Sequence, residues 1–99
     1  MAETLRFHPL VADDLEAAAN WYDDISIELG NRFREAIDLR FDSVELQPES
    51  FGFVDPPMRA AIVGRFPYLI VFEHSRLATE VLGVFHSASD PTKWRGRRR

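Results

Sequence analysis

The chain has 99 residues, 45% of them hydrophobic and 28% charged, and a formal net charge of −4. It has no cysteine for disulfides or thiolate metal sites, no signal-peptide layout, and no run approaching the roughly 20 apolar residues of a membrane span. We therefore expect one cytoplasmic domain over residues 1–99, with no membrane contact.

The first half of the sequence predicts a strand followed by an amphipathic helix. Residues 4–7 favour a short strand, which the pair His8-Pro9 closes. From Pro9 onward, apolar side chains recur at spacings of three and four residues, the pattern of one helix face. Trp21 lies beside this face, and we expect it to pack in the core or between helices. The face itself comprises Val11, Leu15, Ala18, Tyr22 and Ile25.

A second helix is predicted from Ser26 to about Leu46. Ser26 is a good N-cap after a break expected at Asp23-Asp24, and Pro48 ends the helix. Gly30 near its start favours a close approach between helices. Because the link is so short, the two helices should form an antiparallel hairpin. The apolar face of the second helix comprises Phe33, Ile37, Phe41 and Val44.

The second half of the sequence predicts strands. Residues 58–63, 66–73 and 80–86 favour strands, and residues 51–54 favour a strand or a loop. The apolar run over residues 81–85 ends abruptly at His86, which is typical of an interior strand buried on both faces. Asp90-Pro91 then predicts a turn or a short helix. The predicted fold class is α+β, a two-layer sandwich with an N-terminal strand, a helical hairpin on one face of the sheet, and an antiparallel three- to four-stranded meander.

Positive charge is concentrated at the C-terminus. Residues 93–99 hold five of the twelve Lys and Arg residues, which leaves residues 1–92 with seven against sixteen acidic residues, a net charge of −9. Such a basic block is either a solvated tail or a contact for a polyanion. The acidic body disfavours free-standing nucleic-acid binding.

Motifs that follow one another along nearly the whole chain point to a known family. They are Phe7-His8-Pro9, Asp14-Leu15, Trp21-Tyr22, Ser26, Leu29-Gly30, Arg32-Phe33, Pro48, Arg59, Arg65-Phe66-Pro67-Tyr68, Ile70, Phe72, Val84-Phe85-His86, Asp90-Pro91 and Trp94. In their order and spacing the chain resembles the RelE/ParE superfamily of toxins from type II toxin–antitoxin modules, on the ParE-like side. The resemblance implies a strand–helix–helix–meander fold, a role in growth inhibition and plasmid stabilisation, and a cognate antitoxin whose extended C-terminal segment wraps the toxin.

The resemblance implies two alternative targets. RelE-like members cut mRNA in the ribosomal A site, whereas ParE-like members are associated with poisoning DNA gyrase. The family commonly places an arginine between the histidine and Asp-Pro, and here that position is Ser89, which weakens the nuclease interpretation. We therefore predict a toxin that binds DNA gyrase. A ribosome-dependent mRNA endoribonuclease and a degenerate, non-toxic family member are the alternatives.

Candidate site residues follow from the chemistry of these alternatives. RNA cleavage needs a general base, a general acid and cations for the phosphorane charge, and His86 is the catalytic candidate because an unperturbed imidazole titrates near working pH. Each candidate also has a structural interpretation, as a backbone-bonded histidine, a surface arginine or a tryptophan packed on the sheet. The three histidines are not spaced like metal ligands, and we expect no metal ion or cofactor. The target-binding candidates, taken as a positive rim at the sheet end, are Arg59, Arg65, His86, Lys93, Trp94 and Arg95.

Overall fold

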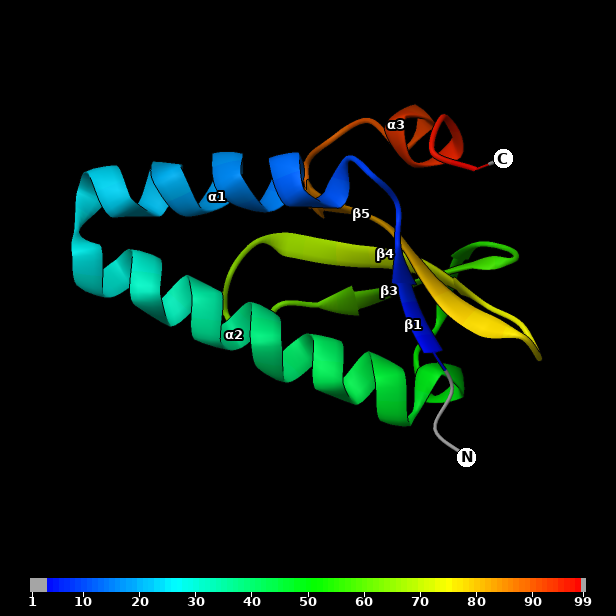
Figure 1. Ribbon diagram of the computed structural model, residues 1–99. Coiled ribbons are helices and arrows are strands. Elements are labelled where there is room, and N and C mark those ends of the chain that lie inside the picture. The colour runs from blue at the N-terminus through cyan, green and yellow to red at the C-terminus, as the bar shows by residue number, and fades with distance from the viewer. Residues whose placement is uncertain (1–3, 99) are drawn as a thin grey trace.

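The fold is built on one five-stranded sheet with a helical hairpin on one of its faces (Figure 1). The computed structural model describes residues 4–98. This arrangement confirms the predicted α+β class. The strands are β1 Thr4–Phe7, β2 Phe53–Asp55, β3 Met58–Ile62, β4 Tyr68–His74 and β5 Ala78–His86, in the order β1-β5-β4-β3-β2. The helices are α1 Val11–Ile25, α2 Ile27–Leu46, the 3-10 helix Pro48–Ser50 and α3 Thr92–Arg95.

Strand β5 lies between β1 and β4, which confirms residues 81–85 as an interior strand. Strands β2 to β5 form the antiparallel meander. However, β1 runs parallel to β5, so the sheet is mixed, whereas we expected an antiparallel sheet. The chain passes through two helices and three strands between β1 and β5, and a parallel pair needs such a long crossover.

Ser26 separates α1 from α2 and caps the second helix. Its hydroxyl oxygen accepts a hydrogen bond at 3.0 Å from the amide three residues later, as an N-cap does. The break expected at Asp23-Asp24 is wrong, because both residues belong to the last turn of α1. Asp23 instead accepts two hydrogen bonds from Arg34 of α2, which hold the pKa of Asp23 below its ordinary value. Gly30 makes room for this bridge, since a Cβ there would lie 1.6 Å from Asp23 Oδ1.

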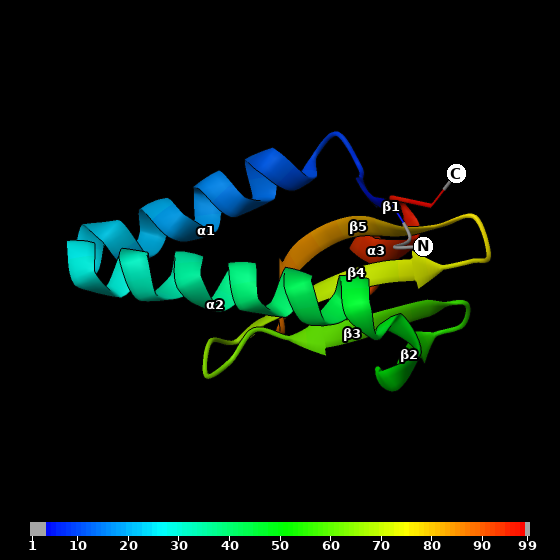
Figure 2. The same ribbon diagram turned by 60° about the horizontal axis from the view of Figure 1, so that its bottom comes forward.

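Both faces of the sheet are buried, each under a different element. Helices α1 and α2 cover one face (Figure 2), over a core that includes Phe33, Ile37, Val44, Ile70, Phe72 and Val81. The short helix α3 packs on the opposite face, where Trp94 joins a second core of Met58, Val71, Leu82 and Phe85. The basic block is therefore anchored to the sheet through Trp94, although Lys93, Arg95 and Arg98 stay exposed. Arg99 lies outside the described residues.

Two apolar side chains of α1 that we predicted to pack against the core are exposed instead. Trp21 is 66% exposed and Ile25 is 63% exposed. The hairpin extends beyond the sheet (Figure 1), so the last turns of α1 have no strand beneath them. Within residues 4–98, no helix is both long enough and apolar enough to cross a membrane.

Candidate functional site

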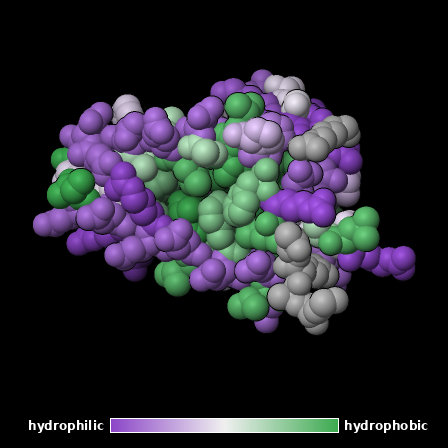
Figure 3. Space-filling view, in the orientation of Figure 1, coloured by the Kyte–Doolittle hydropathy of each residue, from purple (hydrophilic) through white to green (hydrophobic). Residues whose placement is uncertain are grey.

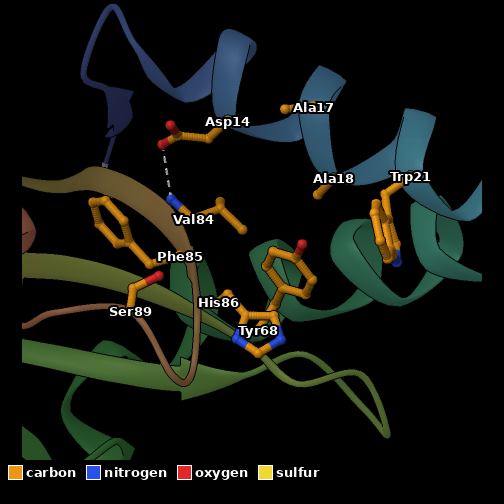
Figure 4. Close-up of a pocket in the computed structure, with 9 residues that line it drawn as sticks. All are labelled: Asp14, Ala17, Ala18, Trp21, Tyr68, Val84, Phe85, His86 and Ser89. Carbon is orange, nitrogen blue, oxygen red and sulfur yellow. Dashed lines mark hydrogen bonds between the residues drawn. The ribbon is translucent and has the colours of Figure 1, made fainter.

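An open recess lies where β5 ends, between the sheet and α1 (Figure 4). We call it the His86 recess. Its volume is about 290 Å³, and it is lined by Asp14, Ala17, Ala18, Trp21, Tyr68, Val84, Phe85, His86 and Ser89. Tyr68 begins β4 and His86 ends β5, and the two residues are paired across the strands. Their rings meet edge to face with centroids 5.3 Å apart, so the sheet itself positions both rings.

His86 is held by the turn that follows β5. The Ala88 amide donates a hydrogen bond to His86 Nδ1 at 3.0 Å, and the Ser89 amide donates to the His86 carbonyl at 2.9 Å. Because Nδ1 accepts, the neutral imidazole carries its proton on Nε2. No hydrogen bond of Nε2 is present among residues 4–98. His86 therefore offers the recess one N–H donor.

Tyr68 is anchored in the core by its ring and presents its hydroxyl to the recess (Figure 4). The ring packs edge to face against Tyr22 and Phe33, at centroid distances of 6.2 Å and 5.4 Å. Burial raises the pKa of the Tyr68 phenol, so the hydroxyl stays protonated at neutral pH. Within the described part of the chain this hydroxyl has no hydrogen-bond partner, and it is a second free donor.

Helix α1 supplies the facing wall. Ala17 and Ala18 leave space over Val84, and Trp21, one turn later, closes the side of the recess (Figure 4). Trp21 was not among the predicted site residues, because its position beside the apolar face suggested packing. The one signal in the sequence is that Trp21 directly precedes Tyr22 of the apolar face. This position turns the Trp21 side chain toward the flank of the helix.

Asp14 lines the recess, but its charge is already compensated. Arg97 donates to both carboxylate oxygens at 2.9 Å and to the Leu82 carbonyl at 3.0 Å, and the Val84 amide donates to Asp14 Oδ2 at 3.0 Å. Both side chains of the pair are largely buried. Gly83 lets the guanidinium approach, since a Cβ there would lie 2.8 Å from Arg97 Nη1. The recess is therefore close to neutral.

The other predicted site residues do not line the recess. Arg59 donates to the Phe51 carbonyl at 2.6 Å and stacks over the Phe53 ring at 4.0 Å. Arg95 pairs with Asp55 at 2.6 Å. Trp94 is 8% exposed in the second core, so it does not form part of a surface rim.

Three of the predicted cations stay exposed, namely Arg65, Lys93 and the Asp55-paired Arg95. Arg65 lies in the turn between β3 and β4, at the same end of the sheet as His86, because β4 begins three residues later. Lys93 lies on α3, which packs on the opposite face. Among residues 4–98, no group of three His, Asp or Glu side chains could hold a metal ion.

A second hollow surface runs along the other flank of α1, between α1, α2 and β1. We call it the hairpin groove. Figure 3 shows apolar side chains between two polar bands that follow the helices. Phe7 of β1 and Phe41 of α2 meet edge to face at its end, with centroids 5.2 Å apart. Its apolar lining includes Phe7, Val11, Leu15, Ala19, Phe33, Ile37 and Phe41.

Comparison with known proteins agrees with this fold. Residues 5–91 match the sequence profile of the family described as ParE toxin of type II toxin-antitoxin system, parDE. Among solved structures, a chain of the chromosomal ParDE TA system from P. aeruginosa is similar. Its TM-score is 0.72 at 17% sequence identity, over 86% of this chain and 96% of that chain. Comparison with curated protein sequences gives no match.

Proposed function

Because the chain belongs to the ParE toxin family of type II toxin–antitoxin systems, we propose that it inhibits growth by binding and poisoning DNA gyrase. A cognate antitoxin neutralises it in this proposal, in keeping with the ParDE system of the similar solved chain. The observation that carries the proposal is the His86 recess, whose lining is mainly aromatic or small and, among residues 4–98, includes no Lys or Arg. Such a surface suits a protein side chain.

The basic residues support binding over RNA cleavage. A nuclease gathers cations around the scissile phosphate, next to its general acid and base. Here Arg59 and Arg95 are engaged with other groups of the same chain, away from the lining of the recess. Ser89 is the recess residue at the position where an arginine is common in the family. Among residues 4–98, His86 therefore has no Lys or Arg beside it in the lining of the recess.

Expression of the protein without its antitoxin is expected to impair DNA supercoiling and to leave mRNA ends unchanged. His86→Ala should lower growth inhibition less than about 10-fold, whereas the loss of a proton-transfer group costs about 10²–10⁴-fold. Mapping of mRNA ends and a supercoiling assay on the same cells provide the measurement. Codon-phased mRNA cuts that vanish in His86→Ala would overturn the proposal, and normal growth would indicate a non-toxic member.

The hairpin groove is the surface that we assign to the antitoxin. An amphipathic segment buries its apolar side in such a groove, and the exposed Asp38 at the groove's border is available to its polar side. Phe7 is 47% exposed at one end of the groove and presents an aromatic anchor. The groove and the His86 recess lie on different flanks of α1, which separates antitoxin binding from target binding.

Co-expression with the antitoxin is expected to give a stable complex whose melting temperature exceeds that of the toxin by about 10–20 °C at 100-fold excess over Kd. Phe7→Ala should weaken this binding about 30-fold, as hot-spot aromatic residues do. Phe53→Ala is the matched control, because Phe53 is 54% exposed on the opposite edge strand. Titration calorimetry measures both variants, and equal losses would exclude the groove.

A further inference from the structure

We propose that the His86 recess receives one apolar or aromatic side chain from a protein segment that also carries basic residues. This inference rests on the proposed function, because it names the part of the toxin that grips its protein target. The argument uses the shape of the recess, its hydrogen-bond donors and the charge around it.

The shape of the recess suits a single inserted side chain. Its volume of about 290 Å³ exceeds that of any one residue, so a side chain and part of its backbone fit. Ala17, Ala18 and Val84 form an apolar floor, and the rings of Trp21 and Tyr68 stand at its sides (Figure 4). Trp21 is 66% exposed, which leaves a large aromatic surface for a partner to cover. Tryptophan and tyrosine beside a small hollow are the residues that dominate binding energy at protein interfaces.

The polar groups of the recess are mainly donors. Besides the Ser89 hydroxyl, which both donates and accepts, they are Trp21 Nε1–H, the Tyr68 hydroxyl and His86 Nε2–H, and none of these three has a hydrogen-bond partner among residues 4–98. The Asp14 carboxylate, the strongest acceptor nearby, is already used by Arg97 and by the Val84 amide. Backbone carbonyls of an inserted segment supply the acceptors that these donors require.

The charge around the His86 recess favours a protein over a nucleic acid as its binding partner. Within the described part of the chain no Lys or Arg lines the recess, and the sequence of α1 contains no basic residue. Asp13 lies one turn before Ala17 and Asp24 lies three residues after Trp21, so both exposed carboxylates border the recess side of α1. A phosphate backbone is repelled by this border, whereas Lys or Arg next to the inserted side chain is attracted to it.

The test compares three variants of the full chain with the wild type. Trp21→Ala removes the aromatic wall and should weaken binding to purified DNA gyrase about 30-fold. Tyr68→Phe removes only the hydroxyl donor and should weaken binding about 3- to 10-fold. Leu39→Ala is the matched control, because Leu39 is 69% exposed on α2 and lines neither hollow. Growth inhibition is measured for all four proteins, and unchanged melting temperatures establish that each variant is folded.

The outcomes separate this inference from the proposed function. If the wild type binds gyrase and Trp21→Ala binds equally well, the recess is not the docking site, although the function stands. If the wild type inhibits growth without binding gyrase, the target is wrong, and loss of inhibition in Trp21→Ala still supports the recess. Tight binding of a ten-nucleotide oligouridine that Trp21→Ala abolishes would overturn the choice of a protein partner.

Discussion

Replacement of Arg97 by alanine is expected to lower the free energy of unfolding by about 3 kcal/mol. Arg97 makes two hydrogen bonds to Asp14 and one to the Leu82 carbonyl, and the two side chains of the ion pair are only 16% and 14% exposed. Its removal leaves a largely buried carboxylate with the Val84 amide as its remaining partner. The cost of such an orphaned charge exceeds the net value of the pair itself. Urea denaturation followed by circular dichroism measures the change.

Arg95→Ala is the matched control for this prediction. Arg95 also pairs with an acidic residue, Asp55, but the two side chains are 58% and 36% exposed. An exposed ion pair contributes about 0–1 kcal/mol, so this variant should remain close to the wild type. Equal losses for the two variants would mean that the Asp14–Arg97 pair is no more than a surface contact. A double-mutant cycle with Asp14→Ala isolates the coupling between the two side chains.

Trp94→Ala is expected to cost about 3–5 kcal/mol, the largest loss of any substitution considered for this chain. Trp94 is the only residue of the four-residue helix α3 that is buried, and it closes the second core over Met58, Leu82 and Phe85. Without the indole ring, α3 has no apolar contact that holds it to the sheet. The expected result is early thermal unfolding together with loss of the near-ultraviolet signal.

Trp94→Phe provides the control. The Trp94 Nε1–H group is buried and has no hydrogen-bond partner among residues 4–98, so the smaller ring removes an unpaired donor while it keeps most of the apolar contact. We expect a loss of about 1 kcal/mol or less. If Trp94→Phe and Trp94→Ala were equally damaging, the indole N–H would have a role that packing does not explain. Trp94→Phe also leaves Trp21 as the sole fluorescent indole of the chain.

The contacts of Arg97 and Trp94 change what a deletion in the basic C-terminal block would test. If residues 97–99 were a free basic tail, their removal would weaken target binding only gradually, through the loss of positive charge. Arg97 and Arg98 are instead bonded to Asp14 and Glu73 of the body. We therefore expect this deletion to destabilise the fold, so that it tests Arg97 more than it tests target binding.

Much of the fold could be predicted because it depends on local patterns. Ser26 caps α2 through a contact three residues away, and the stripe from Phe33 to Val44 has the helical period. The apolar run before His86 likewise identifies an interior strand. These local patterns do not predict the direction of β1, because its parallel pairing with β5 depends on the path of the long chain segment that connects the two strands.

The candidate site was harder to predict because it depends on residues that are distant in sequence. His86 was identified because it ends an apolar strand, but its ring neighbour Tyr68 comes from the strand before, and Trp21 comes from α1. The Asp14–Arg97 pair joins residues 83 positions apart, and no local pattern indicates it. Charge counts alone suggested a free basic block, because they do not reveal which carboxylate each arginine meets.

The residues that line the two surfaces are synthesised at different times on the ribosome. The apolar lining of the hairpin groove comes wholly from residues 7–41. The His86 recess needs residues up to Ser89, and the ion pair that compensates Asp14 needs Arg97. At synthesis rates of about 5–20 residues per second, roughly 2–10 s separate Phe41 from Ser89. However, β1 is held in the sheet by its pairing with β5, so Phe7 takes its place at the end of the groove only after residues 78–86 have been made. The groove and the recess therefore depend on the same late strand.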